Sequence, residues 1–269
     1  MKVDKSFFSL LKRYSSWIDA GAILVWGFVL LYYWFTEKLY ILIHPRYFGL
    51  TVAAGISLLI LGGLKICELW NISKNQKLSG QSQSGFSGLE NQQHINFFPP
   101  GWGSALLLIS ALLALTITPQ VFASQTALQR GLTESLPVTR TQPQAFRTAT
   151  KPEDRSLIEW IRTLNVYPEP DAYNDQKVEV TGFVIYPPAL SEQYFWISRF
   201  ILTCCAADAY PVGLPVKLPE GRSRSKYPQD SWFKIEGKMI TDELNGQRKL
   251  TILPSEIEPI PKPKNPYDY

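Results

Sequence analysis

Three long runs without a charged residue dominate the first half of this 269-residue chain. They cover residues 20–35, 47–64 and 101–118, which contain no Asp, Glu, Lys or Arg. At about 1.5 Å of rise per residue, each run is long enough to cross most of a bilayer's hydrocarbon core as a helix. One such run would also suit a buried helix of a soluble protein, but three in succession favour a membrane. We predict transmembrane helices at about residues 17–36, 45–65 and 101–119.

Basic residues precede the first run, as they do in a secretory signal peptide. A cleaved signal has a shorter apolar core and ends in small residues, whereas this run closes on Tyr32, Tyr33, Trp34 and Phe35. Aromatic residues of this kind gather at the membrane interface. The sequence therefore predicts a helix that is retained in the membrane.

The orientation follows from the distribution of Lys and Arg, which remain on the cytoplasmic side. An amino terminus inside the cell leaves most of the flanking basic residues inside: Lys2, Lys5, Lys12, Arg13, Lys65, Lys74 and Lys77. Only Lys38, Arg46 and Arg130 then flank the spans outside. We predict a multi-pass protein of the inner (plasma) membrane, in contact with lipid, with a cytoplasmic amino terminus and an extracytoplasmic carboxyl-terminal domain.

The membrane domain is expected to cover residues 1–122, with a flexible cytoplasmic loop at 71–96 that is rich in Gln, Ser, Asn and Gly. A polar linker should follow at residues 123–152. Gly49, Ala53 and Ser57 recur every fourth residue in the second span, so small side chains line one helix face. This face could pack within the three-helix bundle or dock to a separate membrane protein.

Residues 153–269 are predicted to form a mainly β domain with one amino-terminal helix. A capping-box pattern at Thr150–Glu153 marks the start of that helix. Five segments rich in β-branched and aromatic residues follow, at 177–186, 194–202, 212–218, 232–240 and 249–258. Gly182 and Gly237 stand inside two of them, where glycine permits the sharp coil of a small closed barrel. We expect an OB-like small barrel, with a Greek-key sandwich as the alternative.

The domain also contains two adjacent thiols, Cys204 and Cys205, followed closely by Asp208. Neighbouring residues on a regular strand face opposite sides, so the thiols can act together only if the strand ends there. Two sulfurs and a carboxylate oxygen could hold zinc or another thiophilic metal, although a closed tetrahedral site needs four ligands. His44, in the loop expected on the same side of the membrane, is a candidate fourth ligand. Nothing in the sequence requires a cofactor.

Two other interpretations of the thiols remain open. They could form a redox-sensitive pair, because a disulfide between neighbours would be strained and easily reduced. Alternatively, one thiol is a small buried apolar residue and Asp208 caps the turn. The domain contains no His to act as a base, no phosphate-binding loop and no nucleophile elbow, so we expect no enzyme activity. The modest net charge of +4 gives no reason to expect nucleic-acid binding.

Several motifs together resemble the YcgQ-like family of bacterial membrane proteins. They are the turn at residues 43–47 (IHPRY), the strand motif at 182–184 (GFV), Arg199–Phe200, the CCxADA motif that begins at Cys204, the motif at 232–237 (WFKIEG) and Pro266–Tyr267. The family is described as one subunit of a two-component permease. The resemblance implies a separate polytopic permease of the YcgR-like family as partner. It also points to Cys204, Cys205 and Asp208 without giving them a chemical role.

These observations predict an accessory membrane subunit of a permease, which presents a Cys-Cys-Asp site to a metal or another soft ligand outside the cytoplasm. The alternative is a membrane-anchored thiol redox or metal-binding protein with no transport role.

Overall fold

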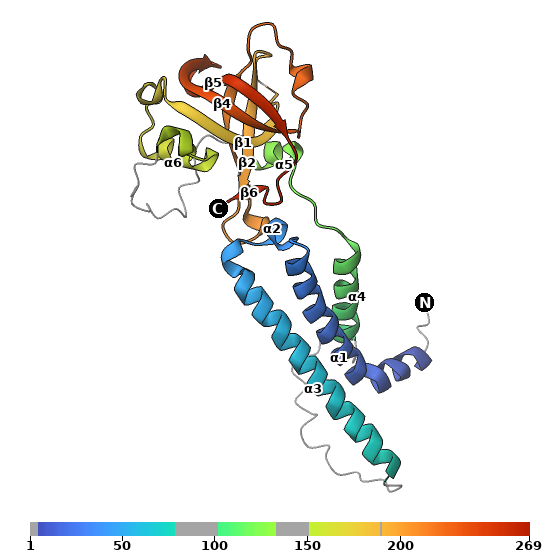
Figure 1. Ribbon diagram of the computed structural model, residues 1–269. Coiled ribbons are helices and arrows are strands. Elements are labelled where there is room, and N and C mark those ends of the chain that lie inside the picture. Colours follow the sequence, from blue (N-terminus) through green and yellow to red (C-terminus); the bar gives the residue numbers. More distant parts are fainter. Residues whose placement is uncertain (1–4, 79–101, 133–150, 189) are drawn as a thin grey trace. The chain divides into compact units, whose positions relative to one another are not determined.

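The computed structural model describes residues 5–78, 102–132, 151–188 and 190–269 (Figure 1). The chain forms two compact units. One consists of Met1–Leu39 and Pro45–Pro119, and the other of Tyr40–His44 and Gln120–Tyr269. The segment between the first two long helices thus belongs to the same unit as the β domain.

Three apolar helices make up the described part of the first unit: α1 (Lys5–Phe35), α3 (Phe48–Leu78) and α4 (Trp102–Thr116). Two stretches are long and apolar enough to cross a membrane, Ser16–Phe35 and Pro45–Lys74. Helix α4 is also apolar, but its 15 residues fall short of a full span. The third transmembrane helix therefore stays a prediction.

Helix α1 packs against α3 through glycines that allow the backbones to approach closely. A Cβ atom on Gly27 would lie 3.0 Å from the carbonyl oxygen of Gly55, and one on Gly62 would lie 2.6 Å from the side chain of Leu24. Because residue numbers rise along α3 as they fall along α1, the two helices are antiparallel. Small residues at such positions are typical of membrane helix pairs.

Helix α4 lies along α1 and runs in the same direction. The indole N–H of Trp26 donates to the carbonyl oxygen of Leu107 at 3.1 Å, and the Tyr33 hydroxyl donates to that of Ala114. Residue numbers rise together along both helices, which makes them parallel. Helices α1 and α4 are therefore parallel to each other, and α3 is antiparallel to both.

The row of Gly49, Ala53 and Ser57 is not part of this packing. All three residues are exposed, and a Cβ atom on Gly49 would meet nothing within 4 Å. In the described helices Gly27, Gly55 and Gly62 make the close contact between α1 and α3. Docking of this row to another membrane protein stays a prediction.

The second unit contains the strands, and five of them lie within a few residues of their predicted positions. They are β1 (Lys177–Ile185), β2 (Tyr194–Ile201), β3 (Tyr210–Lys217), β4 (Trp232–Leu244) and β5 (Gln247–Ile260), and a short β6 (Tyr267–Asp268) was not predicted. Short 3₁₀ turns lie at Pro45–Tyr47, Pro152–Asp154, Pro170–Tyr173, Ala206–Asp208 and Arg224–Lys226.

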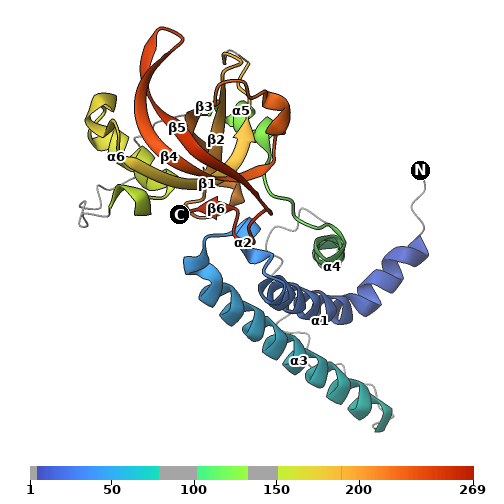
Figure 2. The ribbon, with the colours of Figure 1, turned by 45° about the horizontal axis from the view of Figure 1, so that its top comes forward.

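The six strands of the described residues belong to one sheet, in the order β1-β4-β5-β3-β2-β6 (Figures 1 and 2). Strand β1 also pairs with β2, so the pairings return to their starting strand. A single sheet argues against a two-sheet sandwich. The OB-like barrel itself stays a prediction.

Gly182 and Gly237 each permit a close approach between strands. A Cβ atom on Gly182 would lie 2.6 Å from the carbonyl oxygen of Ser198, and one on Gly237 would lie 2.2 Å from that of Leu253. The β4–β5 register also shifts between Glu236 and Gly237. These positions support the expectation that both glycines let the strands bend sharply.

The helix that opens the β domain starts later than predicted. Residues Pro152–Asp154 form only a 3₁₀ turn, and α6 covers Leu157–Val166. Its capping box is formed by Ser156 and Glu159: the Ser156 hydroxyl accepts from the Glu159 N–H, and the Glu159 carboxylate accepts from the Ser156 N–H at 2.8 Å. The Thr150–Glu153 assignment is wrong because Ser156 directly precedes the buried residues of the helix.

Two expected connectors are also partly ordered. Helix α3 continues to Leu78, so the first residues of the loop predicted at 71–96 are helical. The start of the predicted linker at 123–152 forms α5 (Ser124–Arg130), which buries Ser124 and Ala127 in the second unit. The remainder of both segments, residues 79–96 and 133–150, lies outside the described residues.

Candidate functional site

The two thiols lie in a turn that begins where β2 ends. Leu202 is fully buried, and its N–H donates to the carbonyl oxygen of Asp268 at 3.0 Å, so the chain is anchored directly before the turn. Cys204 is exposed and Cys205 is partly exposed. The 3₁₀ turn Ala206–Asp208 then returns the chain to β3. The strand ends at the thiols, as their joint action requires.

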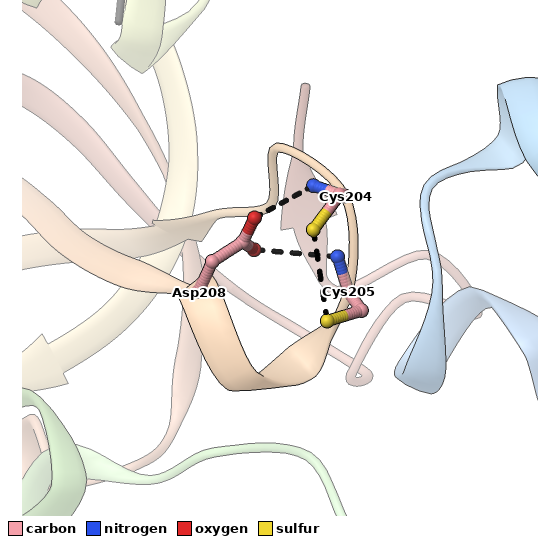
Figure 3. A group of neighbouring side chains, drawn as sticks. All are labelled: Cys204, Cys205 and Asp208. Atoms are coloured by element: carbon pink, nitrogen blue, oxygen red, sulfur yellow. Dashed lines mark hydrogen bonds between the residues drawn. The ribbon is translucent and has the colours of Figure 1, made fainter. Parts of the chain in front are cut away.

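The Asp208 carboxylate holds this turn together (Figure 3). Its Oδ2 accepts from the Cys204 N–H at 2.8 Å and from the Thr203 hydroxyl. Its Oδ1 accepts from the N–H groups of Cys205 at 3.3 Å and Thr203 at 3.4 Å. A carboxylate has about four lone-pair positions, and here four donors use them. Asp208 therefore positions the turn, and the sulfurs are the atoms left to contact a ligand.

The Sγ atoms of Cys204 and Cys205 lie 3.7 Å apart. Two thiolates on one tetrahedral zinc ion, each at about 2.3 Å from the metal, would lie about 3.8 Å apart. The ligand atoms of Cys204, Cys205 and Asp208 all lie within 4.8 Å of one another. The turn thus holds both sulfurs at a separation that suits a thiophilic cation.

Charge and hydrogen bonding oppose ionisation of the first thiol. The hydrogen bond to the Asp208 carboxylate, followed by that to Cys205, raises the pKa of Cys204 to about 11. Burial alone would raise the pKa of Asp208, but the hydrogen bonds from Cys204, Thr203 and the turn backbone together lower it. A nucleophilic cysteine normally has a lowered pKa, so Cys204 lacks the electrostatics of an activated thiol.

The structure brings the backbone of His44 to the thiol turn. Its N–H donates to the carbonyl oxygen of Cys204 at 3.0 Å, and Ile43 forms an antiparallel β-bridge with Cys205. The His44 ring packs edge-on against Tyr269, with ring centroids 4.7 Å apart. His44 therefore neighbours the site, but its ring nitrogens are not among the ligand atoms that lie within 4.8 Å of one another.

The sequence did not predict the arginine contacts that hold the thiol turn against the rest of the domain. Arg199 on β2 forms an ion pair with Asp268 on β6 at 3.0 Å, and both side chains are largely buried. Arg130 of α5 donates to the carbonyl oxygens of Ala206 and Ala209, on either side of Asp208. The Arg199–Phe200 and Pro266–Tyr267 motifs are the sequence signal that could have indicated these contacts, because β2 and β6 pair at Phe200 and Tyr267.

Residues 147–269, which include the whole thiol turn, match the family model described as the DUF1980 C-terminal domain. The family resemblance is confirmed. A Streptococcus mutans serotype c protein named "Putative two-component membrane permease complex subunit" is 29% identical over 106 residues. That alignment covers 39% of this chain and 37% of the relative. The thiol turn therefore lies in the part of the chain that matches the DUF1980 C-terminal domain.

Proposed function

We propose that this protein is an accessory membrane subunit of a two-component permease, and that its thiol turn binds a thiophilic metal ion for that permease. The observation that carries the metal assignment is the 3.7 Å separation of the Cys204 and Cys205 sulfurs, which Asp208 maintains. The name of the Streptococcus mutans relative supports the permease assignment. The partner would be a polytopic permease of the YcgR-like family.

The membrane assignment rests on the apolar helices. Two of them are long enough to span, and the direction of α4, parallel to α1, suits a third crossing. With a cytoplasmic amino terminus, three crossings would carry the DUF1980 domain to the outer face of the inner membrane. The closed order of strand pairings supports an OB-like barrel as the platform for the thiols.

The site would be open, as a transfer site needs to be. The turn offers two sulfurs, and the Asp208 oxygens already serve four donors. A tetrahedral ion held by two protein ligands would keep two positions for water or for groups of the partner. Zinc suits such a site, and other thiophilic ions share its ligand preference. No bond of a substrate is made or broken, so the role is not enzymatic.

Binding at the turn would act directly on the segment between the first two long helices. Ile43 and His44 are hydrogen-bonded to the two cysteines, and Pro45 begins the second candidate span. If metal binding changes the geometry of the thiol turn, the hydrogen-bonded segment would move with it. We infer that this contact links the loading of the metal to the membrane helices.

The test is metal competition on the full-length chain in mild detergent. Zn²⁺ is titrated against a chromophoric chelator, with Cys204→Ser/Cys205→Ser as the test variant. Cys67→Ser is the matched control, because Cys67 lies on α3 in the other unit. We expect one Zn²⁺ per chain, lost in the double variant and kept in the control. Equal Zn²⁺ binding by the double variant would disprove the metal site.

A second candidate function is a thiol redox protein without a permease partner, and the closeness of two free thiols favours it. A disulfide-bonded oxidant would accept two electrons while the thiols lose two protons and form one S–S bond. Intact-mass measurement separates the candidates. Loss of two hydrogens without metal uptake, and without co-purification of a permease, would support the redox function.

A further inference from the structure

A groove on the membrane unit contains a carboxylate among apolar side chains. Its cavity has a volume of about 390 Å³. The residues that line it are Asp19, Ala22, Ile23 and Trp26 of α1, Leu58 of α3 and Leu107 of α4. The α1 residues are spaced i, i+3, i+4 and i+7, so they form one stripe along the helix. The groove follows this stripe, with α3 and α4 as its walls.

Asp19 is the only ionisable residue among the described residues of this lining. It lies inside the candidate span Ser16–Phe35, and its carboxylate accepts a hydrogen bond from the Ser104 hydroxyl of α4. Among the described residues it forms no salt bridge. Acidic side chains within membrane spans are costly and usually face a cavity or pair with an opposite charge. A hydroxyl donor satisfies one lone pair but does not neutralise the charge.

The walls of the groove are fixed by contacts on either side of it. The Trp26 indole is hydrogen-bonded to the Leu107 carbonyl at 3.1 Å, which sets the α4 wall. The close approach of Gly27 and Gly55 sets the α3 wall. Contacts within the bundle therefore hold both walls of the groove.

We propose that this groove docks a membrane helix of the permease partner, and that a Lys or Arg of that helix pairs with Asp19. The inference rests on the proposed function and names the contact through which the two subunits assemble. A purely apolar helix would leave the carboxylate without a counter-charge. A lipid acyl chain would do the same, because it has no cationic or hydrogen-bonding group.

A second copy of this chain is a poorer occupant. Its apolar runs at 20–35, 47–64 and 101–118 contain no Lys or Arg, and Lys65, which follows the second run on α3, forms an ion pair with Glu68 at 4.0 Å. Symmetric contact through the groove would instead bring two Asp19 carboxylates together. Charge complementarity thus selects a different protein with a basic residue in its span.

The test uses the full-length chain in lipid nanodiscs and a synthetic Leu-Ala transmembrane helix with one Lys about one turn from its end. The probe carries a fluorophore, and a second probe has Leu in place of Lys. Asp19→Asn is the test variant, because Asn keeps an acceptor for Ser104 but removes the charge. Thr116→Ala, an exposed change on α4 outside the lining of the groove, is the matched control.

We expect the Lys probe to bind the unsubstituted chain and the Thr116→Ala control at least about tenfold more tightly than Asp19→Asn. The Leu probe should bind all three equally weakly. Equal binding of both probes to the unsubstituted chain, or of the Lys probe to Asp19→Asn, would overturn the proposal. Circular dichroism of each variant confirms that the helices remain folded.

Co-purification separates this inference from the proposed function. The full-length chain is isolated with the YcgR-like permease, and the permease is identified by its mass. Asp19→Asn should reduce its recovery, whereas Cys204→Ser/Cys205→Ser should not. Full recovery with Asp19→Asn would refute the Asp19 contact and leave the permease function standing. Absence of the permease from the unsubstituted preparation would refute the function, and the Lys probe would then test the groove alone.

Discussion

The N–H of His44 donates to the carbonyl oxygen of Cys204 at 3.0 Å. This bond joins two residues separated by more than half of the chain, one between the first two long helices and the other in the thiol turn. The neighbouring bridge between Ile43 and Cys205 makes the contact a short piece of antiparallel pairing. The thiol site is therefore built partly from the segment that connects the candidate spans.

Opening the thiol turn should release the His44 amide. In Asp208→Ala the N–H groups of Thr203, Cys204 and Cys205 lose their acceptor, so the backbone that faces His44 is no longer held. We expect hydrogen exchange at the His44 amide to rise by about tenfold or more, because hydrogen bonds to charged groups contribute about 1.5–3 kcal/mol each. Exchange detected by mass spectrometry measures this change.

The control for this experiment is Asp175→Asn. Asp175 is an exposed residue with positive φ that Asn also tolerates, and its ion pair with Lys238 is long at 3.6 Å. Exchange at His44 should be unchanged in this variant. Unaltered exchange in Asp208→Ala would mean that the carboxylate does not hold the turn.

Cys204 should react slowly with alkylating reagents at neutral pH. The Asp208 carboxylate and Cys205 raise its pKa to about 11, so little thiolate is present near pH 7. We expect the iodoacetamide rate at Cys204, followed by peptide mass spectrometry, to rise up to about pH 11. Asp208→Asn removes the largest cause of the shift and should move the midpoint downwards. A midpoint at the ordinary thiol value of 9.0 in the unsubstituted chain would contradict this assignment.

Stability should fall in acid through Asp208. Hydrogen bonds hold its folded pKa below the ordinary value of 3.8, so its contribution is complete above that value and is lost as pH falls through the lowered pKa. Denaturant unfolding of the full-length chain between pH 6 and about pH 2 would measure the loss. Asp208→Asn should flatten this part of the profile. An identical acid slope in both proteins would exclude the contribution.

Local patterns predicted the strands well because each strand carries its own signal. Alternating β-branched and aromatic residues identified five strands. Gly182 and Gly237, singled out because glycine permits a sharp coil, lie where neighbouring strands approach closely. The helix start was misplaced because Thr150–Glu153 and Ser156–Glu159 both fit the capping pattern. Only the burial of Leu157 and Ile158 distinguishes them, and burial depends on the tertiary structure.

The candidate site was only partly predictable for the same reason. Cys204, Cys205 and Asp208 are close in sequence, so their proximity followed from one turn. The approach of His44 and the pairing of β6 with β2 join distant segments, and a two-residue strand has no periodicity to detect. The burial of α5 was missed because its polar composition resembled that of a linker.

The ion pair between Arg199 and Asp268 provides a test of the support behind the turn. Burial raises the pKa of Asp268 despite the opposing effect of Arg199, so the carboxylate depends on its partner to remain charged. Arg199→Met should lower the free energy of unfolding by about 3–5 kcal/mol, because it leaves a buried charge without a counter-ion. Chemical denaturation of the full-length chain measures the loss.

A double variant distinguishes the loss of the ion pair from the loss of packing. Arg199→Met/Asp268→Leu removes both charges and should recover most of the stability that Arg199→Met loses, since an apolar pair can replace a buried ion pair. Lys238→Met, at an exposed pair, should change the free energy of unfolding by less than about 1 kcal/mol. If the loss of free energy of unfolding in the double variant equalled the sum of the losses in the two single variants, Arg199 and Asp268 would stabilise the fold independently. The contact between β2 and β6 would then depend on backbone pairing alone.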